Sequence, residues 1–178
     1  MVYNPKEHHR RTIRIQGFDY SSGYAYYITL CTQDKACILG RVDQGTICLS
    51  ECGKIVDNII ADLPQRYPGT NIETYVIMPN HIHLIIQLNG DVNDLQVESI
   101  KDRRKMTLPK IIGYLKMNAG KRINIMNGTE GRSVWQKNYF EHVIRNEKAY
   151  IDIFEYIYNN PFEWNEDEYY PNPTEDNS

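Results

Sequence analysis

The sequence predicts an α+β protein in which helices pack on one mostly antiparallel sheet. Segments rich in aromatic and β-branched residues, typical of strands, alternate with segments whose apolar residues recur at the helical period. Their order along the chain is two strands, a helix, two strands, a helix, a strand and a last helix, which favours helices packed against a sheet. The 178 residues suffice for one domain.

The first half of the chain is predicted to contain four of these strands. Turn residues at Gly40 and Asp43-Gln44-Gly45 separate the first two, and Pro79-Asn80 separates the next two. Ser50 has the position of a helix N-cap, and Pro64 is expected to end that helix. The expected elements are strands over 24–33 and 46–49, a helix over 54–63, and strands over 72–78 and 81–88.

The second half begins with a polar, charged segment, 89–106, which we interpret as a linker or loop. The following helix tolerates Pro109 in its first turn and ends at Asn127-Gly128. Asn146 caps the last helix, and Pro161 stops it. The expected elements are a helix over 107–126, a strand over 139–144 and a helix over 147–160.

Composition excludes several classes of protein. No apolar run approaches the roughly 18 residues of a membrane span, and the N-terminus lacks the apolar core of a signal peptide. We therefore expect a soluble, cytoplasmic protein whose four cysteines stay reduced. We expect a single domain over 1–164 with a basic arm over 1–20, followed by an acidic, disordered tail over 165–178.

The net charge of −3 conceals an uneven distribution. Six acids and no Lys or Arg lie between Glu163 and Ser178, whereas the segment from Lys101 to Arg122 carries eight basic residues and one acid. A second basic cluster, Arg10, Arg11 and Arg14, lies near the start. Local basic surface is what a polyanion partner requires, but a solvated helix face and a flexible arm explain these charges equally well.

Two histidines in one strand are the first candidate site. Side chains alternate in a strand, so His81 and His83 point to the same face, about 7 Å apart, with Ile82 on the other. Two imidazoles in this arrangement are able to share a divalent cation. The alternative is a pair of polar residues on a wet sheet face.

The last helix supplies a second candidate. Tyr150, Ile153 and Ile157 belong to one apolar stripe, and Tyr156 and Asn160, four residues apart, lie one above the other beside it. Asn160 thereby places an amide oxygen near a tyrosine hydroxyl. The alternative for Tyr156 is a boundary tyrosine that packs its ring on the sheet.

Taken in order, these motifs resemble the HUH single-tyrosine transposases, and most closely the REP-associated tyrosine transposases. The resemblance covers roughly residues 10 to 164. It is carried by RRTIR (10–14), MPNHIHLII (78–86), VWQ (134–136), YFEHVIR (139–145) and YIYNNP (156–161).

The resemblance implies a ferredoxin-like α+β fold, an antiparallel sheet with helices packed on one face. It implies DNA transposition by cleavage and rejoining of single-stranded DNA beside hairpins, through a 5′-phosphotyrosine. His81, His83 and Asn160 match the residues that hold Mg²⁺ or Mn²⁺, and Tyr156 matches the nucleophile. Relatives occur as monomers and as dimers with the tyrosine donated in trans. DNA contacts are expected from Arg10, Arg11, Arg14, Lys116, Lys121, Arg122, Trp135 and Gln136.

Some alternatives stay open. Tyr158 and Tyr139 are rival nucleophiles, and His142 is either a general base or a structural histidine. A phenol is a good leaving group, so a phosphotyrosine link is reversible without ATP. The rival functions are a nucleic-acid-binding module of the same fold that does not cut, and an unrelated metalloenzyme that acts on small molecules.

Overall fold

The computed structural model describes residues 24–89 and 107–171. Four antiparallel strands form the main sheet in the order β4-β5-β1-β6. Within the described residues, the connections alternate between helices and a tight turn, which is the split βαβ arrangement of ferredoxin-like folds. The strands are β1 (Tyr24–Cys31), β4 (Thr70–Ile77), β5 (His81–Leu88) and β6 (Phe140–Ile144).

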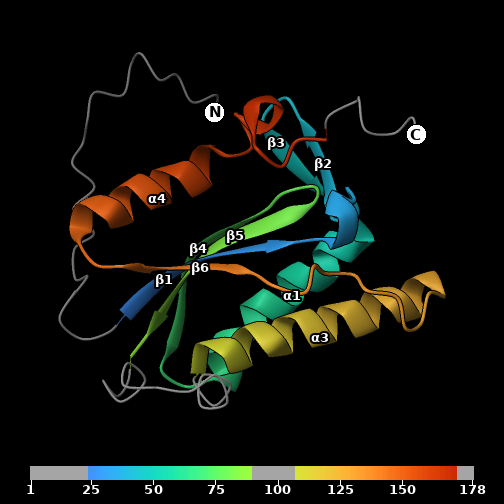
Figure 1. Cartoon of the computed structure of the whole chain (residues 1–178), viewed down its shortest axis with the longest axis horizontal. Coiled ribbons are helices and arrows are strands. Elements are labelled where there is room, and N and C mark those ends of the chain that lie inside the picture. Colours follow the sequence, from blue (N-terminus) through green and yellow to red (C-terminus); the bar gives the residue numbers. More distant parts are fainter. Residues whose placement is uncertain (1–23, 90–106, 172–178) are drawn as a thin grey trace.

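The helices cover both faces of this sheet (Figure 1). α1 (Glu51–Arg66) and α3 (Thr107–Asn127) bury their apolar stripes against one face. α4 (Glu147–Asn159) packs Tyr150 and Ile157 against the other face. The α+β class and the antiparallel sheet are confirmed, and the placement of helices on one face holds for α1 and α3. α4 differs because its apolar stripe meets a second apolar sheet surface around Ile85.

Several element boundaries differ from the sequence prediction. The segment before Thr46 forms an additional strand, so that β2 (Gly40–Asp43) and β3 (Thr46–Leu49) make a separate two-stranded sheet. α1 continues past Pro64 to Arg66, and its predicted N-cap, Ser50, accepts a hydrogen bond from the Gly53 amide. Among the described residues, no helix is long and apolar enough to cross a membrane.

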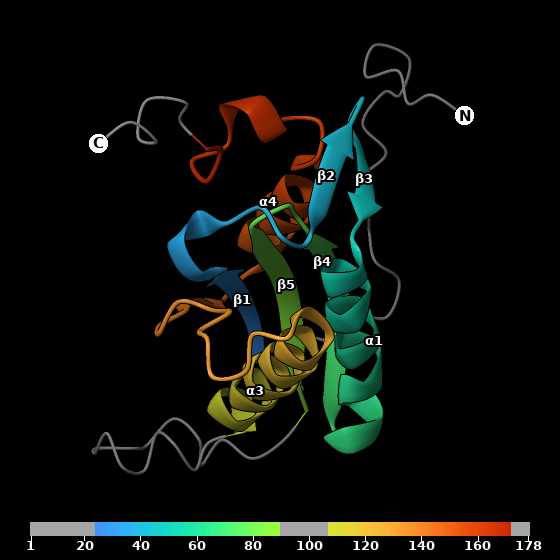
Figure 2. The same cartoon turned by 90° about the vertical axis from the view of Figure 1, so that its right-hand side faces the viewer.

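The end of the chain also differs. Asn165–Pro171 does not behave as part of a disordered tail, because Trp164–Glu166 form a 3₁₀ turn and Tyr169 packs on His81. Figure 2 shows this segment, in red, at the same end of the molecule as the β2–β3 hairpin. The expected basic arm over 1–20 lies outside the described residues, as does nearly all of the predicted linker, and so do residues 172–178.

The turn between β4 and β5 is fixed from both sides, which sets the position of His81. The Asn80 carbonyl accepts hydrogen bonds from the amide and the hydroxyl of Thr32, each 2.9 Å long. The Leu39 amide donates to the Pro79 carbonyl at 2.9 Å. Leu39 is fully buried, so the segment that holds this turn is itself anchored in the core.

The close approach of α1 to this anchor requires Gly53. A Cβ at residue 53 would collide with the Leu39 carbonyl oxygen, whereas a Cβ at Gly113 on α3 would meet nothing within 4 Å. Gly53→Ala should therefore destabilise the fold by about 1–3 kcal/mol. Gly113→Ala should stabilise it by up to about 1 kcal/mol, because alanine is the better helix former. Urea unfolding of the two variants measures both changes, and equal effects would contradict the close contact.

Candidate active site

Two buried histidines on β5 are the centre of the site. His81 and His83 are 0% and 1% exposed, and their ring centroids lie 4.5 Å apart. Alternation along the strand directs both rings to the α4 face, while Ile82 and Leu84 enter the core under α1 and α3. Both histidines thus lie on one face of the strand, as the sequence predicts, and that face is buried rather than exposed to solvent.

Hydrogen bonds from β1 orient His83. Its Nδ1 lies 2.8 Å from the Tyr27 hydroxyl and 2.9 Å from the Thr29 hydroxyl. Its Nε2 lies 3.4 Å from the Tyr156 hydroxyl. With Nδ1 occupied by β1, His83 presents Nε2 to the tyrosine of α4.

His81 is oriented by Asn80, whose own amide is fixed. The Asn80 Nδ2 group donates to the Tyr169 carbonyl at 2.7 Å and to the Lys35 carbonyl at 3.1 Å. Its Oδ1 must therefore act as the acceptor for His81 Nδ1, 2.9 Å away. A proton on Nδ1 leaves a lone pair on His81 Nε2, and this atom is buried without a hydrogen-bond partner. Such an unsatisfied buried lone pair is suited to a cation.

Tyr156 alone among the three candidate tyrosines lies against the histidines. Its ring centroid is 5.2 Å from that of His83 and 6.4 Å from that of Tyr27. Tyr158 is 57% exposed and packs in neither core cluster. Tyr139 lines a groove beside α3, on the opposite side of the sheet. Of these three tyrosines, Tyr156 is the one whose hydroxyl reaches a histidine.

Asn160, the C-cap of α4, and Asp167, which follows the next 3₁₀ turn, also contribute to the site. Asn160 is 1% exposed, and its Nδ2 donates to Asp167 Oδ2 at 2.8 Å, which leaves its Oδ1 buried without a partner. One ligand atom each from His81, His83 and Asp167 lie within 4.8 Å of one another. Two imidazole nitrogens with carboxylate and amide oxygens form a donor set that suits Mn²⁺ and Mg²⁺. The residues present therefore fit a divalent cation.

Sequence reasoning missed Asp167 and Tyr27. Asp167 lies in the acidic segment for which the sequence predicts a disordered tail. Tyr27 and Thr29 share one face of β1 by strand alternation, but only the register of β1 against β5, with Thr29 opposite His83, places that face on the histidines.

Burial controls the protonation of the site. It lowers the pKa of His81 to about 4, although the Asp167 carboxylate acts in the opposite sense. Burial, and then the neighbouring His81, lower the pKa of His83 well below its ordinary value. Burial raises the pKa of Tyr156, and Tyr27, Asp167 and Glu168 add to this shift. At neutral pH both imidazoles are therefore neutral and the Tyr156 phenol is protonated.

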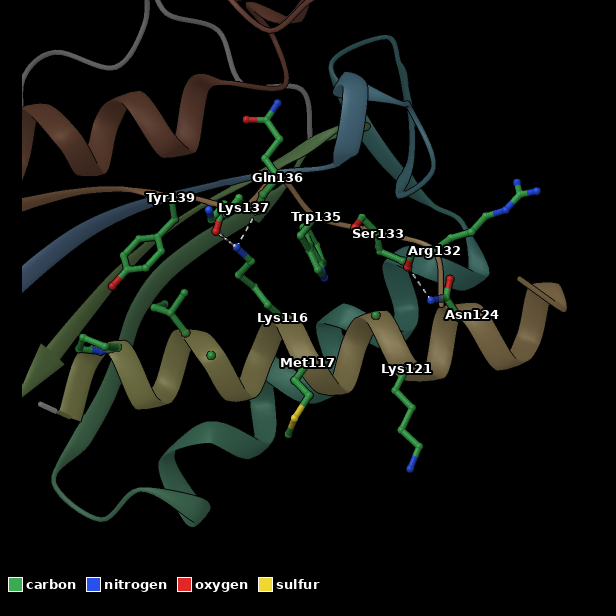
Figure 3. A pocket seen from close by; sticks show the side chains of 15 residues that line it. Lys116, Met117, Lys121, Asn124, Arg132, Ser133, Trp135, Gln136, Lys137 and Tyr139 are labelled. Carbon is green, nitrogen blue, oxygen red and sulfur yellow. Dashed lines mark hydrogen bonds between the residues drawn. The ribbon is translucent and has the colours of Figure 1, made fainter. Parts of the chain in front are cut away.

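The predicted DNA-binding residues separate into groups. Lys116, Lys121, Trp135 and Gln136 line a groove of about 580 Å³ between α3 and the segment before β6 (Figure 3). Arg122 is exposed on α3 but does not line this groove. Arg10, Arg11 and Arg14 lie outside the described residues.

Two of the groove residues have structural roles that the sequence did not reveal. Trp135 is 7% exposed and belongs to the core, so its ring faces are not available to stack on a base. Lys116 donates to the Gln136 and Lys137 carbonyls at 2.7 and 2.9 Å and holds that segment on α3.

The Gln136 side chain points away from α3 (Figure 3). Arg132 and Lys137 also line the groove and were missed.

The buried neutral histidines make stability depend on pH. The unfolded chain protonates histidine near pH ~6.5, whereas folded His81 stays neutral to about pH 4. Acidification through this range therefore favours unfolding, by up to about 1.4 kcal/mol per pH unit for each such histidine. His81→Gln should reduce this loss of unfolding free energy, measured by urea titration of metal-free protein between about pH 7 and pH 5. An identical pH dependence in wild type and variant would contradict the shifted pKa.

The comparisons with known proteins agree with this fold. An uncharacterized protein of Haemophilus influenzae is 37% identical over 174 residues, which cover 94% of this chain and 97% of that protein. A candidate REP-associated tyrosine transposase of the same organism is 26% identical over 145 residues, 80% of this chain and 73% of that protein. No family model matches.

One solved structure extends the relationship to three dimensions. It is a REP-associated tyrosine transposase bound to a REP hairpin, and it aligns with a TM-score of 0.51 and 21% identity over 88% of this chain and 73% of that chain. The structural match shows the shared fold. The 26% identical relative carries the name of the same group of proteins. The chain therefore belongs to one family with the Haemophilus protein that is 37% identical to it, and it is similar in sequence and in fold to REP-associated tyrosine transposases.

Proposed function

We propose that this protein cuts and rejoins single-stranded DNA next to a hairpin, with Tyr156 as the nucleophile. The observation that carries the proposal is the contact between the Tyr156 hydroxyl and His83 Nε2, 3.4 Å apart, beside a cluster of side chains that could hold a cation. The relationship to a REP-associated tyrosine transposase whose structure holds a REP hairpin supports the choice of substrate.

The reaction exchanges one phosphodiester for another. The Tyr156 oxygen forms a bond to phosphorus, the bond to the 3′ oxygen of the preceding nucleotide breaks, and the phenolic proton is balanced by the proton that the leaving 3′ hydroxyl gains. The product is a 5′-phosphotyrosine, which a second 3′ hydroxyl reverses. Because the exchange is near balance, positioning of the phenol and the phosphate matters more than a strong base.

His81, His83, Asp167 and Asn160 would hold the divalent cation. It would supply positive charge that polarises the phosphate and offsets the charge that grows on its oxygens. Tyr156, Asn160 and four acids line the cleft at the nucleophile: Glu163, Glu166, Asp167 and Glu168. A cleft with this negative charge repels phosphate unless a cation is present.

Tyr156 and His83 belong to one chain, so a monomer contains both the proposed nucleophile and the proposed cation-binding side chains.

Covalent capture tests the nucleophile. Wild-type protein, end-labelled hairpin DNA with a single-stranded flank and Mn²⁺ or Mg²⁺ should give a protein–DNA band on a denaturing gel. Tyr156→Phe should remove the band, because only the attacking oxygen is lost. The matched control is Tyr158→Phe, two residues along the same helix, which should retain it, and a chelator should abolish it. A band that survives in Tyr156→Phe would contradict the assignment.

The groove is proposed to track the DNA backbone away from the reacting phosphate. Residues 107–139 carry six basic residues and one acid, and Lys121, Arg132 and Lys137 line the groove. Because Lys116 is engaged by two carbonyls, Lys121 and Arg132 are the cations to test.

Salt dependence distinguishes phosphate contacts from general charge. In a Tyr156→Phe background, Lys121→Ala and Arg132→Ala should each weaken single-strand binding. Each should also reduce the slope of log affinity against log salt by about 0.7. Lys54→Ala is the control, because Lys54 is exposed on α1 and paired with Glu51. Unchanged slopes in both groove variants would exclude the groove as a phosphate track.

A further inference from the structure

We propose that Phe140 is the stacking platform for an unpaired base next to the phosphate that Tyr156 attacks. This inference rests on the proposed function and adds a specific contact with the substrate. Phe140 is the first residue of β6, an edge strand of the sheet, and its side chain is 55% exposed.

Strand register places Phe140 on the face of the histidines. Phe140 is opposite Thr29 in the antiparallel ladder of β1 and β6, and directly opposite residues in such a ladder project to the same face. The Thr29 hydroxyl contacts His83 Nδ1, so this face is the one that carries the site. Phe140 therefore lies at the open edge of the site, on the same side of the sheet as α4.

A single ring joins Phe140 to the nucleophile. The Tyr27 ring makes an edge contact with Phe140, with centroids 6.0 Å apart, and another with Tyr156, with centroids 6.4 Å apart. Tyr27 is itself held by its hydrogen bond to His83. Phe140 and Tyr156 are thus exposed aromatic side chains that border the same half-buried ring.

Among the described residues, Phe140 makes a ring contact with Tyr27 and keeps about half of its surface exposed. Further along β6, Ile144 is buried and packs in the same cluster as Tyr150 and Ile157 of α4. Towards the start of β6 this cover ends, and His142 and Phe140 are both exposed. In the described part of the chain, the start of β6 is thus an exposed edge of the sheet, and Phe140 supplies the apolar surface on it.

This exposed edge of β6 suits an unpaired base. The apolar surface is one aromatic ring, which matches the π-face of one base, and stacking tolerates any base. A base seated there is attached to the strand whose phosphate must reach Tyr156. Held in this way, the neighbouring phosphate would be aligned with the phenol, an effect that the proposed exchange depends on.

A double-perturbation binding experiment tests the stacking. Full-length Tyr156→Phe protein, which leaves the DNA uncut, is titrated with hairpin DNA in which one nucleotide at a time of the single-stranded flank is abasic. Phe140→Ala should weaken binding to intact DNA about tenfold, within the range for loss of one stacked base. At one abasic position, adjacent to the phosphate that wild-type protein cleaves, Phe140→Ala should cause no further loss. Phe140→Trp should retain the affinity.

Phe162→Ala is the matched control, because Phe162 is 61% exposed but its ring lies over Gly45 at the β2–β3 turn. The loss of affinity caused by Phe162→Ala should add to the loss caused by each abasic position. If Phe140→Ala weakened binding by the same factor at every abasic position, or left the affinity unchanged, the stacking proposal would be overturned. Failure of wild-type protein to form the covalent band would instead refute the cleavage chemistry, since the binding experiment uses uncut DNA and decides the stacking by itself.

Discussion

Burial of β5 on both faces determines the chemistry of this molecule. α1 and α3 cover Ile82 and Leu84, and α4 lies on the side to which His81 and His83 point. Polar side chains buried in such a layer require hydrogen-bond partners. Tyr27, Thr29 and Asn80 satisfy the Nδ1 atoms, and His83 Nε2 faces the Tyr156 hydroxyl of α4. Neutral imidazoles with fixed tautomers follow from this burial.

The parts of the site with a regular period were predictable from the sequence. Alternation along a strand put His81 and His83 on one face, and the helical period put Tyr156 and Asn160 together. Tyr27 required the pairing of β1 with β5, fifty-six residues apart along the chain, which local patterns do not encode. Asp167 lies in an irregular acidic segment whose composition suggests solvation. Tertiary contacts from Asn160, Asn80 and Lys35 hold this segment over the histidines.

Charge divides the molecule in a way that suits a polyanionic substrate. The cleft at Tyr156 carries four acids, while cationic side chains line the groove on the opposite side of the sheet. In the proposed function the groove supplies affinity that does not depend on a metal ion, and the cleft admits phosphate only with a cation. Binding and cleavage would then have separate requirements, and the fold keeps them apart by placing each on its own face of the sheet.

The central claim is that the Tyr156 oxygen becomes bonded to the DNA. The most direct measurement is mass spectrometry of the covalent adduct after digestion with protease and nuclease, which locates the residue that carries the residual 5′-phosphonucleotide. This mass should lie on Tyr156 alone. Modification of Tyr158 or Tyr139, or the absence of any adduct under conditions where the protein binds the hairpin, would contradict it.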